Sequence, residues 1–174
     1  TWSECVSTQV YDCTDPEACN YDETANVDDG SCEYNSGTWH VSVDGDDSNC
    51  GSAEAPLAHI QAPIDYASDG DTVLVSAGTY YENILFYNHN GDELFNLTFI
   101  GEDKESTIID GGSNGVVFKI NTHSGEHSYS ISNFTIKNGD GGTNFGGGFD
   151  IDANHQGSLE VALNDLYITN NYSA

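Results

Sequence analysis

The sequence contains no arginine and only three lysines against 29 aspartates and glutamates, which gives 174 residues a formal net charge of −26. Nucleic-acid binding requires clustered basic side chains that neutralise phosphates, so this composition excludes it. Docking on anionic membranes is disfavoured for the same reason. Carboxylates at this density repel one another, and bound Ca²⁺ is the usual means of relieving that repulsion.

Long apolar runs and methionine are also lacking. No window approaches the roughly 18 apolar residues of a membrane-spanning helix, so we expect no membrane insertion. The chain begins at Thr1 without methionine, and we therefore expect a processed or partial chain in which a missing signal peptide does not argue against secretion. The 37% hydrophobic residues, with ten Tyr and seven Phe, are too many for a disordered acidic tail and predict a folded core.

Cysteine is absent from the last 124 residues, because all five cysteines lie in the first 50. They are Cys5, Cys13, Cys19, Cys32 and Cys50. Clustering in a short acidic segment predicts disulfides formed in an oxidising compartment, and hence an extracellular or cell-surface protein. The spacings contain no close pair of the zinc-ribbon kind, which argues against a zinc site. The odd number leaves one cysteine free or bonded to another chain, and the pairing stays open.

The chain divides into two parts. Residues 1–36 are polar and bury too little apolar surface to fold by hydrophobicity alone, so we predict a small disulfide-stapled module that a bound cation would stabilise further. From residue 37 to 174, short β-rich runs alternate with Gly, Asn and Asp turns. This second part contains one helical candidate at 57–67, which Pro63 is expected to shorten or kink.

The β-rich part contains a sequence repeat. Strands are expected at 72–75, 84–87, 97–100, 107–109, 116–120, 129–136, 148–151 and 159–169, with a turn at 77–80 and the long final runs bent or double. Phe134 and the residues after it recur from Leu166, 32 residues on, and the run from Val117 recurs from Gly148, 31 residues on. Two motifs at nearly one spacing predict an all-β solenoid whose coils stack their strands in parallel.

An antiparallel sandwich is the alternative architecture, since it also has many short strands. Scarce two-residue hairpin turns and the in-register repeats argue against it. In the solenoid, Asn138, Asn170 and Asn171 are expected to form internal ladders stacked from coil to coil.

Three stretches resemble a known family. Residues 41–52, 56–61 and 70–83, the last reading Gly-Asp-Thr-Val-Leu-Val-Ser-Ala-Gly-Thr-Tyr-Tyr-Glu-Asn, are similar to the opening of secreted right-handed parallel β-helix proteins of the pectate-lyase-like class. Residues 136–149 and 168–171 resemble later coils of that class. The resemblance covers 39–174 and implies a right-handed parallel β-helix with a short N-terminal capping helix, although Pro63 departs from the small residue usual there. This fold carries lyases, hydrolases, adhesins and structural proteins, so it implies no single activity.

Residues 12–32 resemble a Cys/Asp-rich repeat of secreted bacterial surface proteins, and more loosely the calcium-binding repeats of thrombospondin-like proteins. The candidate ligands are Asp22, Asn26, Asp28 and Asp29, beside Gly30. Hard oxygen ligands at this spacing suit Ca²⁺, although the pattern is not an EF-hand. The acidic turn at 44–47 is a second candidate. The alternative is that these residues form turns with solvated side chains.

Catalytic residues are scarce. A lyase acting on acidic polysaccharides needs a basic residue, and the chain offers only Lys104, Lys119 and Lys137 on a molecule that repels such substrates. Asp150 and Asp152 alternate on a predicted strand, so they share one side about 7 Å apart and could form a glycosidase-like pair. The alternative is a solvated outer face. We therefore leave enzymatic activity open and lean against it.

Two surface features complete the prediction. Asn96, Asn133 and Asn171 lie in N-x-S/T sequons and are glycosylation candidates. The final run still reads as a solenoid strand without a cap, which predicts either a fragment or an end that docks on another protomer and propagates head to tail. The leading prediction is an extracellular structural or adhesive unit that associates with itself or another extracellular protein. The alternative is a carbohydrate-active or carbohydrate-binding β-helix.

Overall fold

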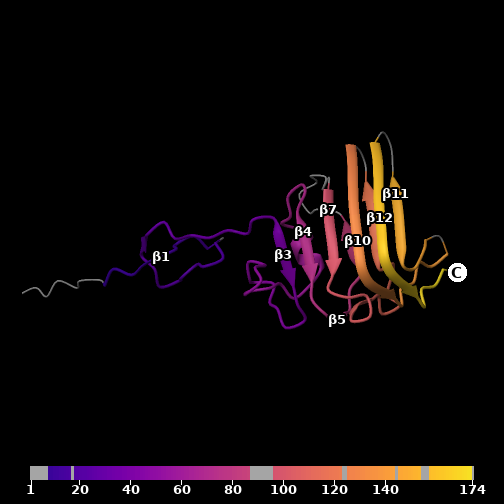
Figure 1. The fold of residues 1–174 in the computed structure, drawn as a ribbon, viewed down its shortest axis with the longest axis horizontal. Helices are drawn as coiled ribbons and strands as arrows, with labels where there is room; N and C mark the ends of the chain where they lie inside the picture. The colour runs from indigo at the N-terminus through magenta and orange to yellow at the C-terminus, as the bar shows by residue number, and fades with distance from the viewer. Residues whose placement is uncertain are drawn as a thin grey trace, which may run out of the picture. The chain divides into compact units, whose positions relative to one another are not determined.

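The computed structural model describes residues 8–16, 18–86, 96–122, 125–143, 145–153 and 157–173. The chain forms two compact units, Thr1–Ser36 and Gly37–Ala174. Figure 1 labels their elements.

The first unit is held by covalent bonds more than by a core. Strands β1 (Tyr11–Asp12) and β2 (Val27–Asp28) form a short parallel pair. A disulfide joins Cys13 to Cys32, and Cys19 and Cys50 of the chain are disulfide-bonded as well. These bonds confirm the predicted disulfide staples, whereas Cys5 lies outside the described residues. Because a unit of this size buries little apolar surface, the cross-links supply the stability that a core would otherwise give.

The second unit is a parallel β-solenoid of about four turns, as predicted. Its strands are β3 (Thr38–Val41), β4 (Thr72–Val75), β5 (Gly78–Tyr80), β6 (Ile84–Phe86), β7 (Asn96–Gly101), β8 (Thr107–Asp110), β9 (Phe118–Thr122), β10 (Gly125–Lys137), β11 (Phe149–Ala153) and β12 (Gly157–Thr169). Each pairing of these strands is parallel. This topology rules out the antiparallel sandwich.

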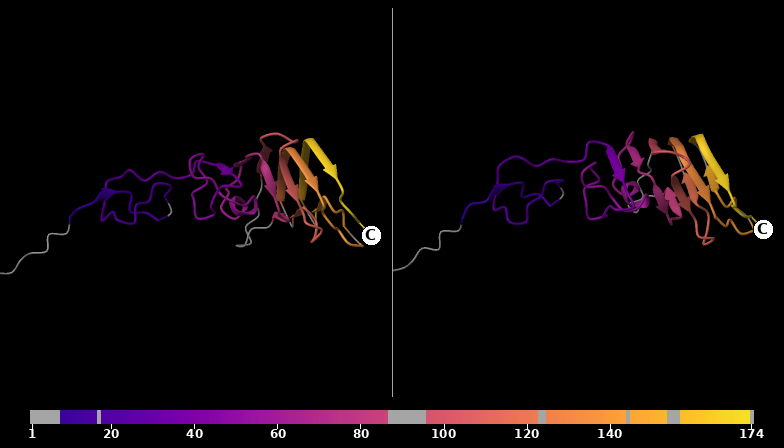
Figure 2. Two further views of the ribbon diagram at one scale, coloured as in Figure 1. Left: turned by 90° about the horizontal axis from the view of Figure 1, so that it is seen from below. Right: turned by 60° about the horizontal axis from the view of Figure 1, so that its bottom comes forward.

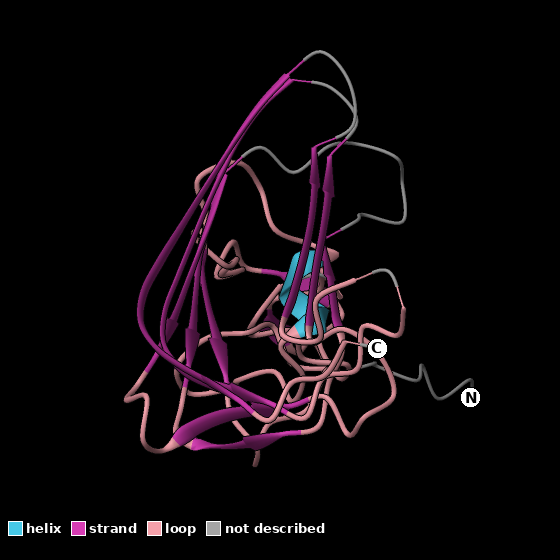
Figure 3. Cartoon of the chain, turned by 90° about the vertical axis from the view of Figure 1, so that its right-hand side faces the viewer, coloured by secondary structure: helices cyan, strands magenta, loops and turns pink. Residues whose placement is uncertain are grey.

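Three walls enclose the interior. The first stacks β3, β4, β7 and the N-terminal parts of β10 and β12, and the second stacks β5, β8 and the C-terminal parts of the same two long strands. The third stacks β6, β9 and β11. Figure 2 shows the stacked strands from two further sides, and in Figure 3 the strands of each wall lie one behind another.

The sequence repeat corresponds to the strand register. Phe134 pairs with Leu166 and Phe118 with Phe149, the two spacings expected from the sequence. The long strands β10 and β12 bend as predicted, because Asn133 and Asp165 adopt left-handed backbone conformations with φ of 65° and 48°. Short polar side chains tolerate that conformation, so a single residue turns each of these two strands from the first wall to the second.

Apolar side chains stack in columns inside the walls. Val73, Phe99 and Ile131 are register neighbours on successive coils and are fully buried. Phe86 contacts Phe99 with its ring edge at a centroid distance of 5.1 Å. Each column repeats one inward position of the pleat, so the core runs continuously through the coils.

The local predictions fare differently. Helix α1 (Gln61–Ile64) has only four residues and is shorter than the apolar pattern of 57–67, as expected from Pro63 inside it. Residues 78–80 form strand β5 and not the expected turn. Two of the three asparagines expected in ladders form bonds between coils: Asn138 Nδ2 donates to the Asp110 carboxylate at 2.9 and 3.0 Å, and Asn171 bonds to the backbone of the coil below. The ladder itself, with Asn170, stays a prediction.

Candidate functional site

Three of the four predicted calcium ligands form local turns, and the fourth, Asn26, bonds to residues 8 and 10, which are distant in the sequence. Asp22 Oδ1 accepts hydrogen bonds from the backbone and hydroxyl of Thr24 at 2.8 and 2.7 Å. Asp28 and Asp29 accept backbone hydrogen bonds from the residues two places on, at 2.9 and 3.0 Å. Asn26 Oδ1 accepts the N–H of residue 10 at 3.1 Å. These bonds lower the pKa of Asp22 and of Asp29 below the ordinary value.

Over the described ranges, no three His, Cys, Asp or Glu side chains gather into a group that could hold a metal ion. The turn hydrogen bonds of Asp22, Asp28 and Asp29 all end on Oδ1, so the second carboxylate oxygen takes no part in the turn. The calcium site stays a prediction.

The two candidate catalytic carboxylates occupy the third wall. Asp150 and Asp152 alternate along β11 with Phe149 and Ile151, whose register partners in β9 are buried core residues. The two aspartates therefore point to the outer side. Asp150 lies 3.7 Å from Lys119 Nζ, its register partner on the coil below.

All three lysines of the chain lie beside aspartates on other coils. Lys104 Nζ donates to Asp165 at 3.2 Å and lies 5.0 Å from the centre of the Tyr167 ring. Lys137 Nζ lies 3.5 Å from Asp110. Together with Lys119, these side chains form ion pairs between coils, so the positive charges act within the fold.

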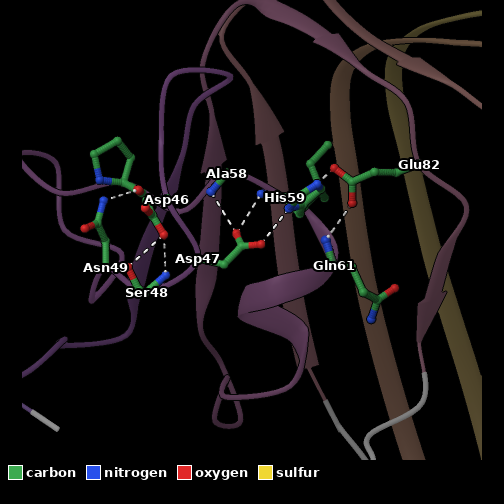
Figure 4. Close-up of polar contacts among 10 residues, drawn as sticks. Asp46, Asp47, Ser48, Asn49, Ala58, His59, Gln61 and Glu82 are labelled. Atoms are coloured by element: carbon green, nitrogen blue, oxygen red, sulfur yellow. Dashed lines mark hydrogen bonds and ion pairs between the residues drawn. The ribbon is translucent and has the colours of Figure 1, made fainter. Parts of the chain in front are cut away.

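The segment around α1, where the resemblance implied a short N-terminal capping helix, is anchored by carboxylates that the sequence did not predict. We call residues 42–67 the N-terminal cover. Asp47 Oδ1 accepts the backbone N–H groups of Ala58 and His59 at 2.9 and 3.0 Å, and Asp47 Oδ2 lies 2.5 Å from His59 Nδ1 (Figure 4). One carboxylate thus fixes two successive donors and the side chain beside them.

Glu82 completes the arrangement from the loop after β5. Its two carboxylate oxygens accept the N–H groups of Ile60 and Gln61 at 2.9 and 3.0 Å (Figure 4). The four N–H groups at the start of a helix have no partner within it. Glu82 therefore satisfies the N–H groups of the N-cap residue Ile60 and of Gln61, the first residue of α1, while Asp47 holds the two residues that precede them.

The cover also pairs the exposed strand edges of the first coil. Gln61 behaves as a strand neighbour of β6, since its side-chain oxygen accepts the Leu85 N–H at 2.8 Å and its amide donates to the Leu85 carbonyl at 3.1 Å. Along β3, His40 donates to Gly51 at 2.8 Å and accepts from Leu57 at 2.9 Å. Backbone groups that another chain could pair with are therefore already bonded.

Ionisation in the cover depends on these contacts. Burial raises the pKa of Glu82, and the two backbone donors offset that rise only in part. The hydrogen bond to Asp47 raises the pKa of His59 above its ordinary value. Burial acts to raise the pKa of Asp47 as well, but the bonds from His59 and Ala58 outweigh it and the net pKa is lowered. The pair is therefore charged across mildly acidic pH.

One signal in the sequence could have revealed the cover. The N-cap residue of α1 is Ile60, whose side chain cannot cap a helix, so the N–H groups at its start needed acceptors from elsewhere. The abundant carboxylates were the available acceptors. Which of them served could not be known without the fold.

The three sequons lie at different places on the solenoid. Asn96 is exposed at the start of β7, where its amide donates to Asp69 at 2.7 Å. Asn133 is half-buried at the bend of β10. Asn171 is half-buried, with its side chain bonded to Gly139 and Ile136 at 2.7 and 3.0 Å. Asn96 is thus the sequon asparagine with the most open surroundings.

No helix among the residues described is long and apolar enough to cross a membrane.

Comparison with known proteins finds no family model and no solved structure that matches the chain. The chain is 33% identical over 93 residues to a Bacillus subtilis (strain 168) protein named "Uncharacterized protein YwoF". The match covers 53% of this chain and 19% of that relative, so the chain spans about a fifth of the relative's length. What the structure supports of the resemblance seen in the sequence is the disulfide-bonded parallel β-solenoid.

Proposed function

We propose that this chain is an extracellular structural or adhesive β-solenoid unit. The observation that carries the proposal is the use of its charged side chains. The three lysines pair with aspartates on other coils, and Asp47 and Glu82 bind the backbone of the cover. Charged side chains that an enzyme would use on a substrate here bind other parts of the same chain.

Two features support an extracellular setting. Disulfide bonds at Cys13, Cys19, Cys32 and Cys50 form and persist in oxidising compartments. The acidic repeat at 12–32 resembles segments of secreted bacterial surface proteins, and a net charge of −26 keeps such a surface hydrated and dispersed.

A carbohydrate-active or carbohydrate-binding solenoid is the second candidate. Its support is a polar and aromatic group on the outer side of the third wall. Lys119 Nζ lies 5.0 Å from the centre of the Phe145 ring, which is exposed, and 3.7 Å from Asp150. An aromatic face beside carboxylates is a surface on which a sugar ring could rest.

Incubation with a panel of neutral and acidic polysaccharides separates the two candidates. We expect no turnover and no retention of the chain on any of them. Turnover that Asp150→Asn or Asp152→Asn abolishes, with Asp69→Asn as an exposed control, would overturn the structural role in favour of the carbohydrate candidate.

Electron microscopy of native material with and without EDTA tests the assembly and calcium predictions together. Filaments that fray in EDTA are the result expected for a calcium-stabilised fibre. A head-to-tail fibre built through strand edges would have to displace the N-terminal cover, because Gln61 and residues 51 and 57 already occupy edges of the first coil.

A further inference from the structure

The described residues contain two Asn-Gly pairs, at 114–115 and at 138–139, and both lie where the second wall turns toward the third. The first pair follows β8, and the second follows the C-terminal part of β10 on the next coil. The backbone N–H of Ser113 donates to the carbonyl of Asn138 at 2.7 Å, so the two turns lie side by side. The same dipeptide thus occurs twice at one corner of the solenoid. A third pair, at 90–91, lies outside the described residues.

The Asn-Gly dipeptide loses its side-chain amide more readily than other asparagine sequences. The backbone nitrogen of the following residue attacks the carbonyl carbon of the asparagine side chain, and glycine has no side chain to hinder that attack. Asparagine is accordingly counted among the thermolabile residues. In a folded protein, the rate depends on how firmly the structure holds the attacking nitrogen and the departing amide.

The fold holds both of these groups in the pair at 138–139. Asn138 Nδ2 donates to the two carboxylate oxygens of Asp110 at 3.0 and 2.9 Å. The Gly139 N–H donates to Asn171 Oδ1 at 2.7 Å. Gly139 is buried and Asn138 is half-buried. Because the attacking nitrogen and the departing amide are both bonded, this pair reacts only after the corner opens.

The pair at 114–115 has neither restraint. Asn114 is exposed, and among the described residues its side chain has no hydrogen-bond partner. The backbone N–H of Asn114 donates to the Gly111 carbonyl at 3.1 Å, which fixes the turn, whereas the Gly115 N–H has no backbone acceptor in the described ranges. Water therefore reaches the amide, and no bond withholds the nitrogen that attacks it.

We propose that Asn114 deamidates spontaneously in the folded protein and that the fold protects Asn138. The Gly115 nitrogen forms a bond to Asn114 Cγ, the bond between Cγ and Nδ2 breaks, and Nδ2 leaves as ammonia with the proton of the Gly115 nitrogen. Water then opens the resulting succinimide ring at either carbonyl and returns a proton to that nitrogen. One opening yields aspartate, and the other yields isoaspartate, in which the main chain runs through the side-chain carbons. Water is the co-reactant of both steps.

The modification changes the corner in charge and in length. Each event adds a negative charge to a chain whose net charge is already −26. Isoaspartate also lengthens the backbone path between Asn114 and Gly115 by one atom. The Gly115 carbonyl accepts the N–H of Asp140 on the next coil at 2.8 Å, so we expect this bond between coils to weaken. The proposal is independent of the structural or adhesive role, because it depends only on this corner.

Peptide mapping by mass spectrometry of native protein stored in mildly alkaline buffer tests the proposal. Asn114 should convert about tenfold faster than Asn138 or more, because the reaction at Asn138 has to wait for local opening. Isoaspartate, which its specific methyltransferase labels, should accompany aspartate at residue 114. In denaturant the two pairs should react at similar rates, since the fold no longer distinguishes them. Asn114→Gln, whose longer side chain would have to close a six-membered ring, should remove the product at this turn.

Two further measurements separate the fold from the dipeptide. Asn171→Ala releases the Gly139 N–H and should speed conversion of Asn138 while leaving the rate at Asn114 unchanged. Hydrogen exchange at the Asp140 amide should rise on storage in the wild type but not in Asn114→Gln. Native protein in which Asn138 converts as fast as Asn114, or in which Asn114 stays intact while it reacts in denaturant, overturns the proposal. An Asp140 amide that exchanges equally in stored wild type and variant overturns the expected effect on the corner.

Discussion

The first and last coils of the described chain are built from the same kind of strands but differ in what lies against them. At the N-terminal end, Trp39 heads the first inner column, is half-buried, and stacks on the Tyr66 ring at 6.2 Å. Leu57, Ile60 and Ile64 beside it are at most 1% exposed. At the C-terminal end, the corresponding column finishes at Leu163, which is 39% exposed. A solenoid coil therefore buries its interior only when something covers it.

The ends also differ in how carboxylates are compensated. At the N-terminal end, Asp47 in the cover and Glu82 after β5 accept backbone N–H groups of the cover, and Asp47 also pairs with His59. Toward the C-terminal end, Asp110, Asp150 and Asp165 are compensated by the three lysines. Because the chain has only three lysines, backbone N–H groups serve the carboxylates at the N-terminal end, and the lysines serve carboxylates on neighbouring coils.

The largest expected difference comes from truncating two side chains of one inward-facing column, one in a middle coil and one in the last coil. Ile131→Ala should lower the free energy of unfolding by about 2–5 kcal/mol, since it opens a cavity in a buried column. Leu163→Ala should cost about 1 kcal/mol in dilute monomer, because that side chain is already partly hydrated. Urea unfolding of both variants measures this, and equal losses would mean that the last coil is as well covered as the middle ones.

The N-terminal cover gives the next largest effect. Glu82→Ala leaves two N–H groups, at Ile60 and Gln61, without their acceptor and should lower the free energy of unfolding by about 2 kcal/mol. Glu82→Gln retains one carbonyl oxygen and should lose less. Thermal unfolding compares both variants with Glu105→Ala. Glu105 is an exposed glutamate in the loop between β7 and β8, so its replacement should leave the stability nearly unchanged. If Glu82→Ala were as mild as this control, the carboxylate would not be anchoring α1.

Particular residues show how far the sequence could predict this fold. The spacings of 32 and 31 predicted the register correctly, because inward positions repeat from coil to coil and leave a pattern in one dimension. The same alignment places Lys119 directly beneath Asp150, so that ion pair was also within reach of the sequence. Contacts that repeat with the coil are therefore predictable.

The cover was not predictable in the same way. Asp47 meets residues 58–59 and Glu82 meets residues 60–61 once only, so no repeat marks these contacts. The local sequence predicts a turn at 77–80, but residues 78–80 form β5, and Val43 packs against Gly78 so closely that a side chain there would lie 2.5 Å from Val43 Cγ1. Tertiary packing, and not local preference, decides such positions.

A smaller effect is expected from pH, and it should appear at the N-terminal end. Because the pKa of His59 is raised above 6.5, its ion pair with Asp47 contributes fully below that pH and is lost as pH rises through the folded-state value. The pKa of Asp47 is lowered below 3.8, so its contribution is present above that pH and is lost on further acidification. The pair therefore stabilises the cover between these limits.

The melting temperature of the wild type and of His59→Gln measures this contribution. The wild type should exceed the variant at about pH 6 and lose that advantage by about pH 9. Glu82 also faces His59, and the charge of His59 acts to lower the pKa of Glu82, which burial raises. The comparison is therefore repeated with Glu82→Gln in both proteins, which removes this coupling. A constant difference across this range would show that the imidazole acts through packing alone.

The smallest expected effect is the ion pair between Lys119 and Asp150, and it completes the contrast between backbone donors and lysines. Lys119 is 43% exposed, so solvent screens the pair and its coupling energy should be about 0–1 kcal/mol. A double-mutant cycle of Lys119→Met and Asp150→Asn measures this coupling, which should fall as salt rises. The loss caused by Glu82→Ala should stay nearly constant with salt, because it reflects unpaired N–H groups. A coupling energy that does not fall with salt would mean that the pair is less hydrated than the exposure of Lys119 indicates. The ion pair would then resemble the contacts of Glu82 in being insensitive to salt.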